Sequence, residues 1–246
     1  MKEKEEPKKE SKPHIIIVCG QTATGKSDLA VFLAKKHRGE IISCDSRQVY
    51  TGLDYGSNKI PSKDMQSIPH YGLDIAPLGS YYTVFDFQKY AREKIREILE
   101  RRQNVILCGG TGLFIDAVLF DHYTFGGEKK SLPFSEWHYY PGVSHCTITW
   151  IGLHSTRTQL GSRIHARAKK NLHLIQKEIA DLITERKVDS KWIESLGLEY
   201  TFGIKLYRKE IIEKEYIEMI TLKTIQYAKR QMTWFRRNQA IHWIEV

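Results

Sequence analysis

The sequence predicts an α/β fold, a P-loop NTPase-like doubly wound sheet that is mainly parallel and carries helices on both faces. Two observations lead to this prediction. Apolar runs typical of buried strands alternate along the chain with amphipathic stretches typical of helices. The first apolar run leads into residues 20–27, GQTATGKS, which match the G-x-x-x-x-G-K-[ST] pattern of a phosphate-binding loop between a strand and a helix. We expect residues 14–246 to form one such domain, because 246 residues with 41% hydrophobic content can bury a single sizeable core.

The individual elements follow from the spacing of apolar residues. Short apolar runs that end in polar or glycine-rich turns predict strands, and apolar residues at helical spacing predict helices. The predicted strands are 14–19, 40–44, 104–108, 146–153 and 241–244. The predicted helices are 26–37, 84–102, 113–119, 156–186, 209–219 and a basic helix over about 222–237. The long helical region that starts at residue 156 is predicted to be broken over 192–199.

Three stretches show no clear periodicity. Residues 51–80 are rich in Gly, Pro, Ser and Asp and predict a loop with at most short helices, on the rim of the site. Residues 120–145 combine scattered aromatic side chains with two prolines, and we interpret them as an ordered loop or a shortened insertion. Residues 1–13 mix Lys and Glu without an apolar run, so we expect a disordered charged tail.

The composition favours a protein of the reducing cytosol. The four cysteines lie in or beside apolar runs without a C-x-x-C pair, so we expect buried reduced thiols and a cytoplasmic location; they are Cys19, Cys44, Cys108 and Cys146. No apolar stretch approaches the length of a membrane span, so we expect no membrane association, and we expect a monomer. The formal net charge of +9 suggests a polyanionic partner, although such a surplus is also common in proteins that bind no nucleic acid.

The glycine-rich loop has the groups that a phosphate needs. Gly20 and Gly25 let backbone N–H groups turn toward phosphate oxygens, and the helix that follows favours an anion at its N-terminus. Lys26 supplies a cation and Ser27 offers a hydroxyl to Mg²⁺. The remaining candidate binding residues of the loop are Gln21, Thr22, Ala23 and Thr24. The loop alone does not say which phosphorylated compound it holds, and a loop threonine is structural about as often as functional.

Asp45 is the clearest acid near this loop. It follows the second predicted strand, and ligands of doubly wound sheets bind beyond the carboxyl ends of the strands. The carboxylate could accept a proton or help to hold Mg²⁺ through water, while the alternative role is a cap of a turn or helix. Thr111 follows two glycines after the third long strand, where its hydroxyl could donate to a diphosphate oxygen or orient the carboxylate.

The C-terminal stretch over residues 227–237, YAKRQMTWFRR, concentrates cations and aromatic rings. Helical spacing would bring its cations within reach of phosphates; they are Lys229, Arg230, Arg236 and Arg237. The aromatic side chains Tyr227 and Trp234 could instead belong to the core, and a basic helix is often only a solvated face.

Several short motifs together narrow the interpretation. They are 20–27 GQTATGKS, 42–50 ISCDSRQVY, 52–59 GLDYGSNK, 69–74 PHYGLD, 85–87 FDF, 109–113 GGTGL and 228–235 AKRQMTWF. In this order the chain resembles the tRNA dimethylallyltransferases, also called tRNA isopentenyltransferases. The resemblance is dense over about 15–119 and returns from about 148 to the C-terminus. It implies transfer of a dimethylallyl group from dimethylallyl diphosphate to N6 of the adenosine just 3′ of a tRNA anticodon.

The resemblance also implies roles for the candidate residues. Asp45 would be the catalytic base, and Thr111 and Lys26 would assist it. Residues 20–27 and Arg230 would hold the diphosphate with Mg²⁺ at Ser27. By the resemblance Asp45, Ser46, Arg47 and Gln48 would meet the substrate nucleotide of the tRNA, and the basic helix adds Lys229, Arg236 and Arg237 as candidate tRNA-binding residues.

Two departures from the family pattern keep other functions open. The first is that residues 120–145 replace a longer tRNA-binding insertion. The second is that Ile225 stands where many relatives have an arginine that could hold the diphosphate. Arg230 or Lys229 would have to substitute for that arginine. Prenylation of free AMP, ADP or ATP is therefore an alternative. A small-metabolite P-loop kinase is a further one, and a nucleotide-binding module without catalysis is the remaining reading.

Overall fold

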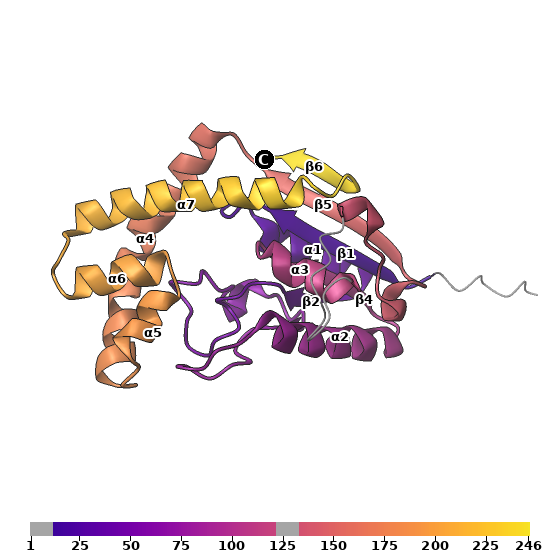
Figure 1. Cartoon of the computed structure of the whole chain (residues 1–246), viewed down its shortest axis with the longest axis horizontal. Coiled ribbons are helices and arrows are strands. Elements are labelled where there is room, and N and C mark those ends of the chain that lie inside the picture. Colours follow the sequence, from indigo (N-terminus) through magenta and orange to yellow (C-terminus); the bar gives the residue numbers. More distant parts are fainter. Residues whose placement is uncertain (1–11, 122–132) are drawn as a thin grey trace, which may run out of the picture.

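The computed structural model describes residues 12–121 and 133–246. Its centre is a six-stranded sheet with the order β3-β2-β4-β1-β5-β6, in which each strand runs parallel to its neighbours (Figure 1). The strands are β1 His14–Gly20, β2 Gly39–Ser43, β3 His70–Tyr71, β4 Asn104–Cys108, β5 Thr147–His154 and β6 Ile241–Glu245. The helices are α1 Lys26–His37, α2 Val84–Glu100, α3 Gly112–Leu119, α4 Arg157–Thr184, α5 Ser190–Ser195, α6 Glu199–Tyr207 and α7 Glu213–Phe235. Three 3₁₀ turns complete the structure: η1 Ser62–Asp64, η2 Phe134–Glu136 and η3 Pro141–Val143.

The central strands are buried on both faces, which confirms the predicted doubly wound sheet. In β1, Ile15 and Ile17 point into the larger core, which α2, α3, α4 and α7 cover. Ile16 and Val18 point to the opposite face and pack against α1. Strands buried in this way have nearly continuous apolar sequences, as β1 has. The fold is P-loop NTPase-like, as the sequence predicts.

The helices α4 to α7 extend past the carboxyl ends of the strands (Figure 1). The helix α4 packs along α7 and also contacts α6, so that these helices form a wall opposite the phosphate-binding loop. Both long helices begin with a defined cap: the Thr156 hydroxyl accepts the N–H of Gln159, and Glu215 accepts the N–H of Ile212. The wall brings residues from the last third of the chain to the edge of the sheet.

Three local predictions were wrong. The two helices predicted over 209–219 and 222–237 are one helix, α7, because no Gly or Pro interrupts it and its buried positions continue at helical spacing through Tyr216, Ile220 and Thr224. The helix α6 was not predicted, and it starts directly after Leu198, whose φ of 39° makes a sharp turn. The stretch 51–80 contains the two-residue strand β3, whose identity depends on pairing with Ile41 and Ile42 rather than on its own sequence.

The C-terminal part of the predicted insertion, residues 133–145, packs on the core. Phe134, Trp137 and Tyr139 lie against the buried ring of Phe120, and the indole of Trp150 donates to the Tyr139 hydroxyl at 3.0 Å. Residues 122–132 of that region, and residues 1–11 of the predicted tail, lie outside the described part of the chain.

The cysteine prediction holds for three of the four thiols. Cys19, Cys44 and Cys108 are buried, while Cys146 is only half-buried. Burial raises the pKa of the Cys108 thiol to about 12, so it carries a proton at neutral pH. Within the described residues, none of the helices has both the length and the apolar character that crossing a membrane requires.

Candidate active site

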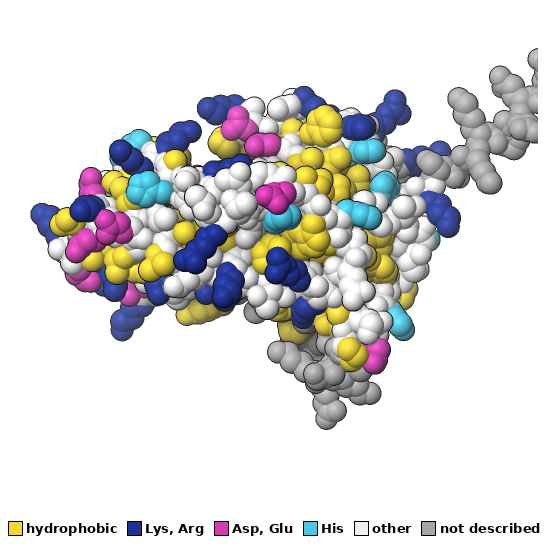
Figure 2. Space-filling model, turned by 90° about the horizontal axis from the view of Figure 1, so that it is seen from above, with side chains coloured by type: hydrophobic (Ala, Val, Ile, Leu, Met, Phe, Trp, Pro, Cys, Tyr) yellow, Lys and Arg dark blue, Asp and Glu magenta, His cyan; other side chains and the backbone are white. Residues whose placement is uncertain are grey.

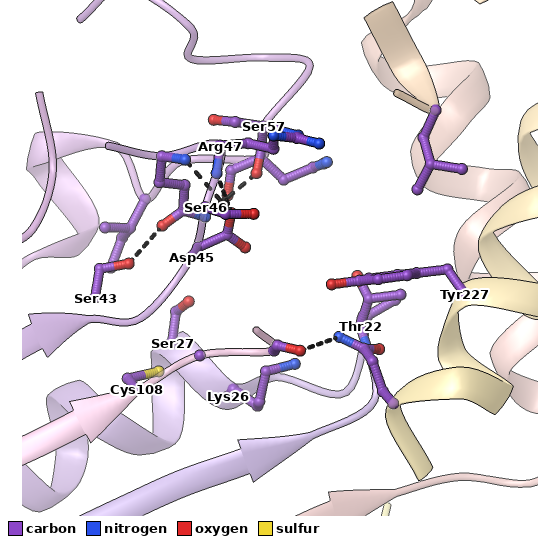
Figure 3. A pocket seen from close by; sticks show the side chains of 18 of the residues that line it. Thr22, Lys26, Ser27, Ser43, Asp45, Ser46, Arg47, Ser57, Cys108 and Tyr227 are labelled. Atoms are coloured by element: carbon purple, nitrogen blue, oxygen red, sulfur yellow. Dashed lines mark hydrogen bonds between the residues drawn. The ribbon is translucent and has the colours of Figure 1, made fainter. Parts of the chain in front are cut away.

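The carboxyl ends of β1, β2 and β4 open into a pocket of about 570 Å³. The phosphate-binding loop forms its floor, residues 45–48 and 56–58 form one side, and α4, α6 and α7 form the other. Figure 3 shows Lys26 and Ser27 on the floor, with Asp45 on one side and Tyr227 on the other. The volume is in the range of small-molecule sites.

The backbone of the loop has the conformation that an anion site requires. Gly20, with φ of 117°, passes so close to β5 that a Cβ there would lie 2.1 Å from the Leu153 carbonyl oxygen. Ala23 and Gly25 also have positive φ, which turns successive N–H groups to one side. Thr24 fixes the turn by donating from its hydroxyl to the Gln21 carbonyl at 2.7 Å. The loop therefore has the backbone shape of an anion site.

Lys26 is the cation of the floor. Its Nζ donates to the Gln21 carbonyl, which keeps the side chain folded over the loop. Burial lowers the pKa of Lys26, and the neighbouring Cys108 and Asp45 act in the opposite direction. An anionic ligand in the pocket would oppose the effect of burial and keep the ammonium charged.

Asp45 lies two residues after β2, at the edge of the sheet that the sequence predicts. Its Oδ1 accepts the N–H groups of Arg47 at 2.8 Å and of Gln48 at 3.4 Å, so the capping role that we considered as an alternative is present. Within the described residues, no hydrogen bond occupies the other oxygen, and the charge of Asp45 influences both Lys26 and Tyr227. One oxygen holds the turn, and the second is free for a ligand.

The second glycine turn packs tightly against the backbone that follows β2. A Cβ on Gly109 would lie 2.2 Å from the Cys44 carbonyl oxygen. Thr111 begins α3, and its Oγ1 accepts the N–H of Ser46 at 3.2 Å. The hydroxyl of Thr111 thus supports the segment that carries Asp45.

Gln231 of α7 connects the two glycine turns. Its Oε1 accepts the N–H of Thr22 at 2.8 Å, and its Nε2 donates to the Gly110 carbonyl at 3.0 Å. The side chain is buried, with 4% exposure. A Cβ on Gly110 would lie 2.2 Å from Nε2, so this position must be glycine for the amide to fit. One residue from the C-terminal helix therefore sets the distance between the two turns.

Tyr227, one turn earlier on α7, forms the wall beside Thr22 (Figure 3). Burial, with a smaller contribution from the charge of Asp45, raises the pKa of Tyr227 to about 12. The phenol therefore remains neutral at physiological pH. It presents a ring face and one hydroxyl to the pocket.

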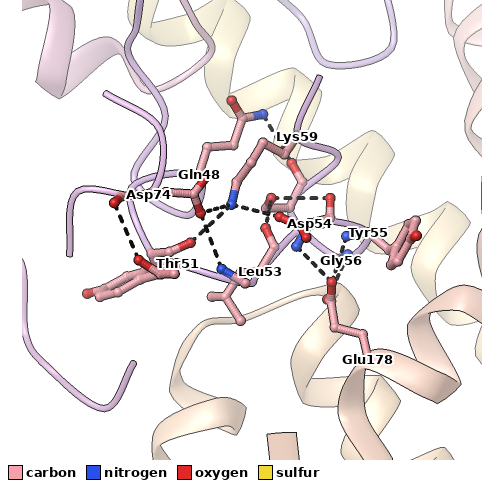
Figure 4. A network of polar contacts seen from close by, with 12 residues as sticks. Gln48, Thr51, Leu53, Asp54, Tyr55, Gly56, Lys59, Asp74 and Glu178 are labelled. Carbon is pink, nitrogen blue, oxygen red and sulfur yellow. Dashed lines mark hydrogen bonds and ion pairs between the residues drawn. The ribbon is translucent and has the colours of Figure 1, made fainter. Parts of the chain in front are cut away.

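The rim loop is held by a carboxylate from α4. Glu178 accepts the N–H groups of Asp54 and Tyr55 at 2.7 Å and of Gly56 at 3.1 Å, and the Tyr200 hydroxyl at 2.9 Å (Figure 4). Lys59 pairs with Asp54 and Asp74 in the same network. A carboxylate with several N–H donors makes strong, charge-assisted bonds. The loop that the sequence predicts as a rim is therefore fixed rather than loose.

Comparison with known proteins decides the family. The family described as IPP transferase matches residues 48–132 and 126–238, most of the chain. The chain belongs to the IPP transferase family. It is 30% identical to the tRNA dimethylallyltransferase of Bacillus pumilus, over 97% of this chain and 91% of that protein. It is 29% identical to the corresponding protein of Staphylococcus epidermidis, over 95% of this chain and 87% of that one.

A solved structure agrees with this assignment. The crystal structure of a tRNA delta(2)-isopentenylpyrophosphate transferase from Staphylococcus epidermidis superposes with a TM-score of 0.79 at 27% identity, and covers 95% of this chain and 93% of that one. The sequence alignment with the S. epidermidis relative runs over 292 positions, more than the 246 residues of this chain, so it contains gaps in this chain. The family assignment confirms the resemblance inferred from the motifs.

Most of the predicted site residues lie together in this IPP transferase pocket. Those that line it are Thr22, Ala23, Thr24, Gly25, Lys26, Ser27, Asp45, Ser46, Arg47, Gln48 and Arg230. Gly20, Gln21 and Thr111 adjoin it and support its loops. Gln48 is engaged in the wall: its amide accepts from Ser43 and donates to two carbonyls of the rim loop.

The predicted tRNA-binding cations of α7 have different surroundings. Lys229 and Arg236 are exposed and do not line the pocket. Arg237, which we predicted to contact tRNA, instead pairs with Asp116 at 2.9 Å and lies 4.0 Å above the Trp234 ring. Its guanidinium therefore fastens the end of α7 to α3, and its contact with tRNA stays a prediction.

Sequence reasoning missed several pocket residues. Tyr227 was considered a possible core residue, and Gln231 was not considered. Arg167 of α4 and Glu199 at the start of α6 also line the pocket, as does Leu198 between α5 and α6. Since these residues lie on helices that the sequence describes only as amphipathic, the motif that contains Gln231 was the one available signal.

The residues present fit a magnesium ion that is shared with a diphosphate. Among the described residues there is no group of three His, Cys, Asp or Glu side chains that could hold a metal alone. Ser27 and Asp45 both line the pocket and offer a hydroxyl and a carboxylate. Mg²⁺ usually takes one or two protein ligands and completes its shell with substrate phosphates and water.

Proposed function

We propose that this chain transfers a dimethylallyl group from dimethylallyl diphosphate to N6 of the adenosine immediately 3′ of the anticodon in tRNA. The observation that carries the proposal is the free oxygen of Asp45, which lies in one pocket with a phosphate-binding loop and its lysine. Family membership supports the type of reaction, and its tRNA dimethylallyltransferase relatives support the acceptor.

The phosphate-binding loop would hold the leaving group of this reaction. The N–H groups of the loop, Lys26 and Arg230 face the space where the diphosphate would lie. As the bond between C1 of the dimethylallyl group and the diphosphate oxygen breaks, negative charge grows on that oxygen, and prearranged donors stabilise it. Mg²⁺ at Ser27 would add positive charge to the same group.

Asp45 would act on the acceptor. The N6 amine of adenine is a weak nucleophile because its lone pair is delocalised into the ring. The free Asp45 oxygen would accept the N6 proton while N6 forms its bond to C1, so that one proton reaches the carboxylate and the diphosphate leaves with the electron pair of the broken C–O bond. The Arg47 and Gln48 N–H groups keep the carboxylate oriented for this transfer.

The acceptor base must leave its stack to enter the pocket. Enzymes that modify a base pay a few kcal/mol for this step, less where the base is already in a single-stranded loop, as it is beside an anticodon. The face of the molecule that carries α7 has Lys and Arg side chains spread among acidic ones (Figure 2). Such a surface can attract a nucleic acid backbone without choosing a sequence.

One assay tests the proposal against the alternatives. Labelled dimethylallyl diphosphate is incubated with the protein and with unmodified tRNA or AMP, and a separate reaction follows the γ-phosphate of ATP. We expect label in tRNA at the adenosine next to the anticodon. Label in AMP but not in tRNA would reject the proposed acceptor. Transfer of the γ-phosphate to a small metabolite would instead support a kinase.

A further inference from the structure

An arginine from α4 faces the pocket with its donors unused. Arg167 lines the wall above the phosphate-binding loop, and its side chain keeps 26% exposure there. The ion pair that it makes with Glu199 is long, at 4.0 Å. Within residues 12–121 and 133–246 no hydrogen bond uses its guanidinium. Five N–H donors without a protein acceptor, inside a pocket, mark a place where a ligand supplies the acceptors.

Arg167 lies near the cation of the loop. Its charge contributes to lowering the pKa of Lys26, after the larger effect of burial. Two cations that face one enclosed space repel each other, and an anion between them removes this cost. Glu199, at 12% side-chain exposure, also lines the pocket and lies 4.0 Å from the guanidinium, so it offsets only part of that charge.

Position 225 of α7 carries an apolar side chain. Ile225 packs with Leu160, Ile164 and Ala228 in a small apolar cluster beside Ala23 of the phosphate-binding loop. A Cβ on Gly161 of α4 would lie 3.5 Å from Ile225 Cδ1, so the two helices touch there. Arg167 follows one turn after Ile164 on the same helix, at the point where this apolar contact ends and the pocket begins.

We propose that Arg167 binds the diphosphate of the prenyl donor and supplies from α4 the charge that position 225 of α7 lacks. The proposal rests on the proposed function for the identity of the donor, but its chemistry needs only a diphosphate. The planar guanidinium can form two parallel hydrogen bonds to phosphate oxygens, which a lysine cannot do. Glu199 is the carboxylate nearest to the guanidinium in this arrangement, at 4.0 Å, and would be a positioning residue for it.

Binding of inorganic pyrophosphate with Mg²⁺, measured by calorimetry, tests the role of Arg167 without tRNA or transfer. We expect Arg167→Gln to weaken pyrophosphate binding by about 10- to 100-fold, as the loss of charged hydrogen bonds predicts. Arg167→Lys should recover only part of the affinity. The matched control is Arg163→Gln, which removes an exposed arginine one turn earlier on α4 and should bind as the wild type does.

A second variant separates binding from stability. Arg167→Gln alone leaves Glu199 without its partner, so Arg167→Gln combined with Glu199→Gln removes both charges and keeps the wall neutral. Weak pyrophosphate binding by a folded double variant supports the proposal. Wild-type affinity in that variant would show that the pair is only structural and would overturn it. A protein that binds pyrophosphate through Arg167 but transfers nothing to tRNA would refute the proposed function alone.

Discussion

At the scale of single residues, Asp45 combines two tasks in one carboxylate. One oxygen caps the turn that carries residues 45–48, and the other is free in the pocket. Asp45→Asn keeps an oxygen for the turn but removes the proposed base. We expect the rate constant of transfer to fall by about 10²- to 10⁴-fold, while pyrophosphate affinity stays within about threefold of the wild type. Single-turnover kinetics and calorimetry measure the two quantities.

The control for this experiment is Asp64→Asn, which changes an exposed carboxylate of η1 outside the pocket. It should leave both quantities unchanged. If Asp45→Asn transfers at the wild-type rate, another group removes the N6 proton, and the assignment of the base is lost.

The raised pKa of Asp116 leads to a prediction about how the stability of the protein depends on pH. Burial raises its pKa to about 7 from an ordinary value of 3.8, although Arg237 and the Trp234 indole favour the charged form. The folded protein then holds a proton that the unfolded chain releases, so this contribution to stability is full below about pH 4 and is lost as pH rises through about 7. Between pH 5 and 8 we expect a loss of about 2 to 3 kcal/mol in the free energy of unfolding from this group.

Asp116→Asn provides the reference for that measurement, because the amide oxygen can still accept the Trp234 N–H but does not titrate in this range. Urea unfolding at pH 5 and at pH 8 gives the difference between wild type and variant at each pH. The wild type should lose stability relative to the variant as pH rises. A difference that does not change with pH would mean that Asp116 is ionised throughout, held by Arg237.

At the scale of elements, α7 acts as a brace for the two glycine turns. Gln231 makes one hydrogen bond to each turn from a buried position. Gln231→Met keeps the volume but leaves the Thr22 N–H and the Gly110 carbonyl without their partner, at a cost of about 1 to 3 kcal/mol for each unsatisfied group. We expect weaker pyrophosphate binding together with lower stability.

Gln226→Met is the matched control, since Gln226 lies exposed on the same helix. It should leave stability and binding as they are. Gln231→Glu gives a second test, because the carboxylate still accepts from Thr22 but cannot donate to Gly110 and adds a negative charge beside the diphosphate. If both Gln231 variants bind pyrophosphate like the wild type, α7 does not set the spacing of the turns.

At the scale of the whole molecule, the sequence predicted the parts whose signals are local. The phosphate-binding loop, the strand before it and the helix after it lie within residues 14–37, and Asp45 follows the next strand directly. The sequence could not predict that Arg167 and Glu199 would face the same pocket. Their place depends on the packing of α4 against α6 and α7, which joins residues far apart in the chain. Arg237 is the opposite case: the sequence suggested a cation available for tRNA, but in the fold its guanidinium pairs with Asp116.

The same long-range packing also determines which cations are available to contact tRNA phosphates. Arg237 pairs with Asp116 and Arg230 lines the pocket, so Lys229 and Arg236 are the exposed predicted cations at the end of α7 that remain outside both. Each phosphate that a cation neutralises releases counterions, so tRNA affinity should fall steeply with salt. Replacing both residues by Ala should reduce the slope of log affinity against log salt by about 1.5, because each lost phosphate contact contributes roughly 0.7 to 0.9 to that slope. Arg237→Gln should change stability more than this slope.

Filter binding or anisotropy over a series of KCl concentrations measures the slope. The control is Arg96→Ala on α2, the helix at the bottom of Figure 1, away from α7 at the top; Arg96 is exposed and pairs only weakly with Glu100 at 4.0 Å. Equal slopes for the wild type and the Lys229→Ala, Arg236→Ala variant would place the tRNA elsewhere on the surface. A smaller slope for that variant alone, with unchanged pyrophosphate affinity, would show that phosphate recognition in the pocket and on the surface are separate.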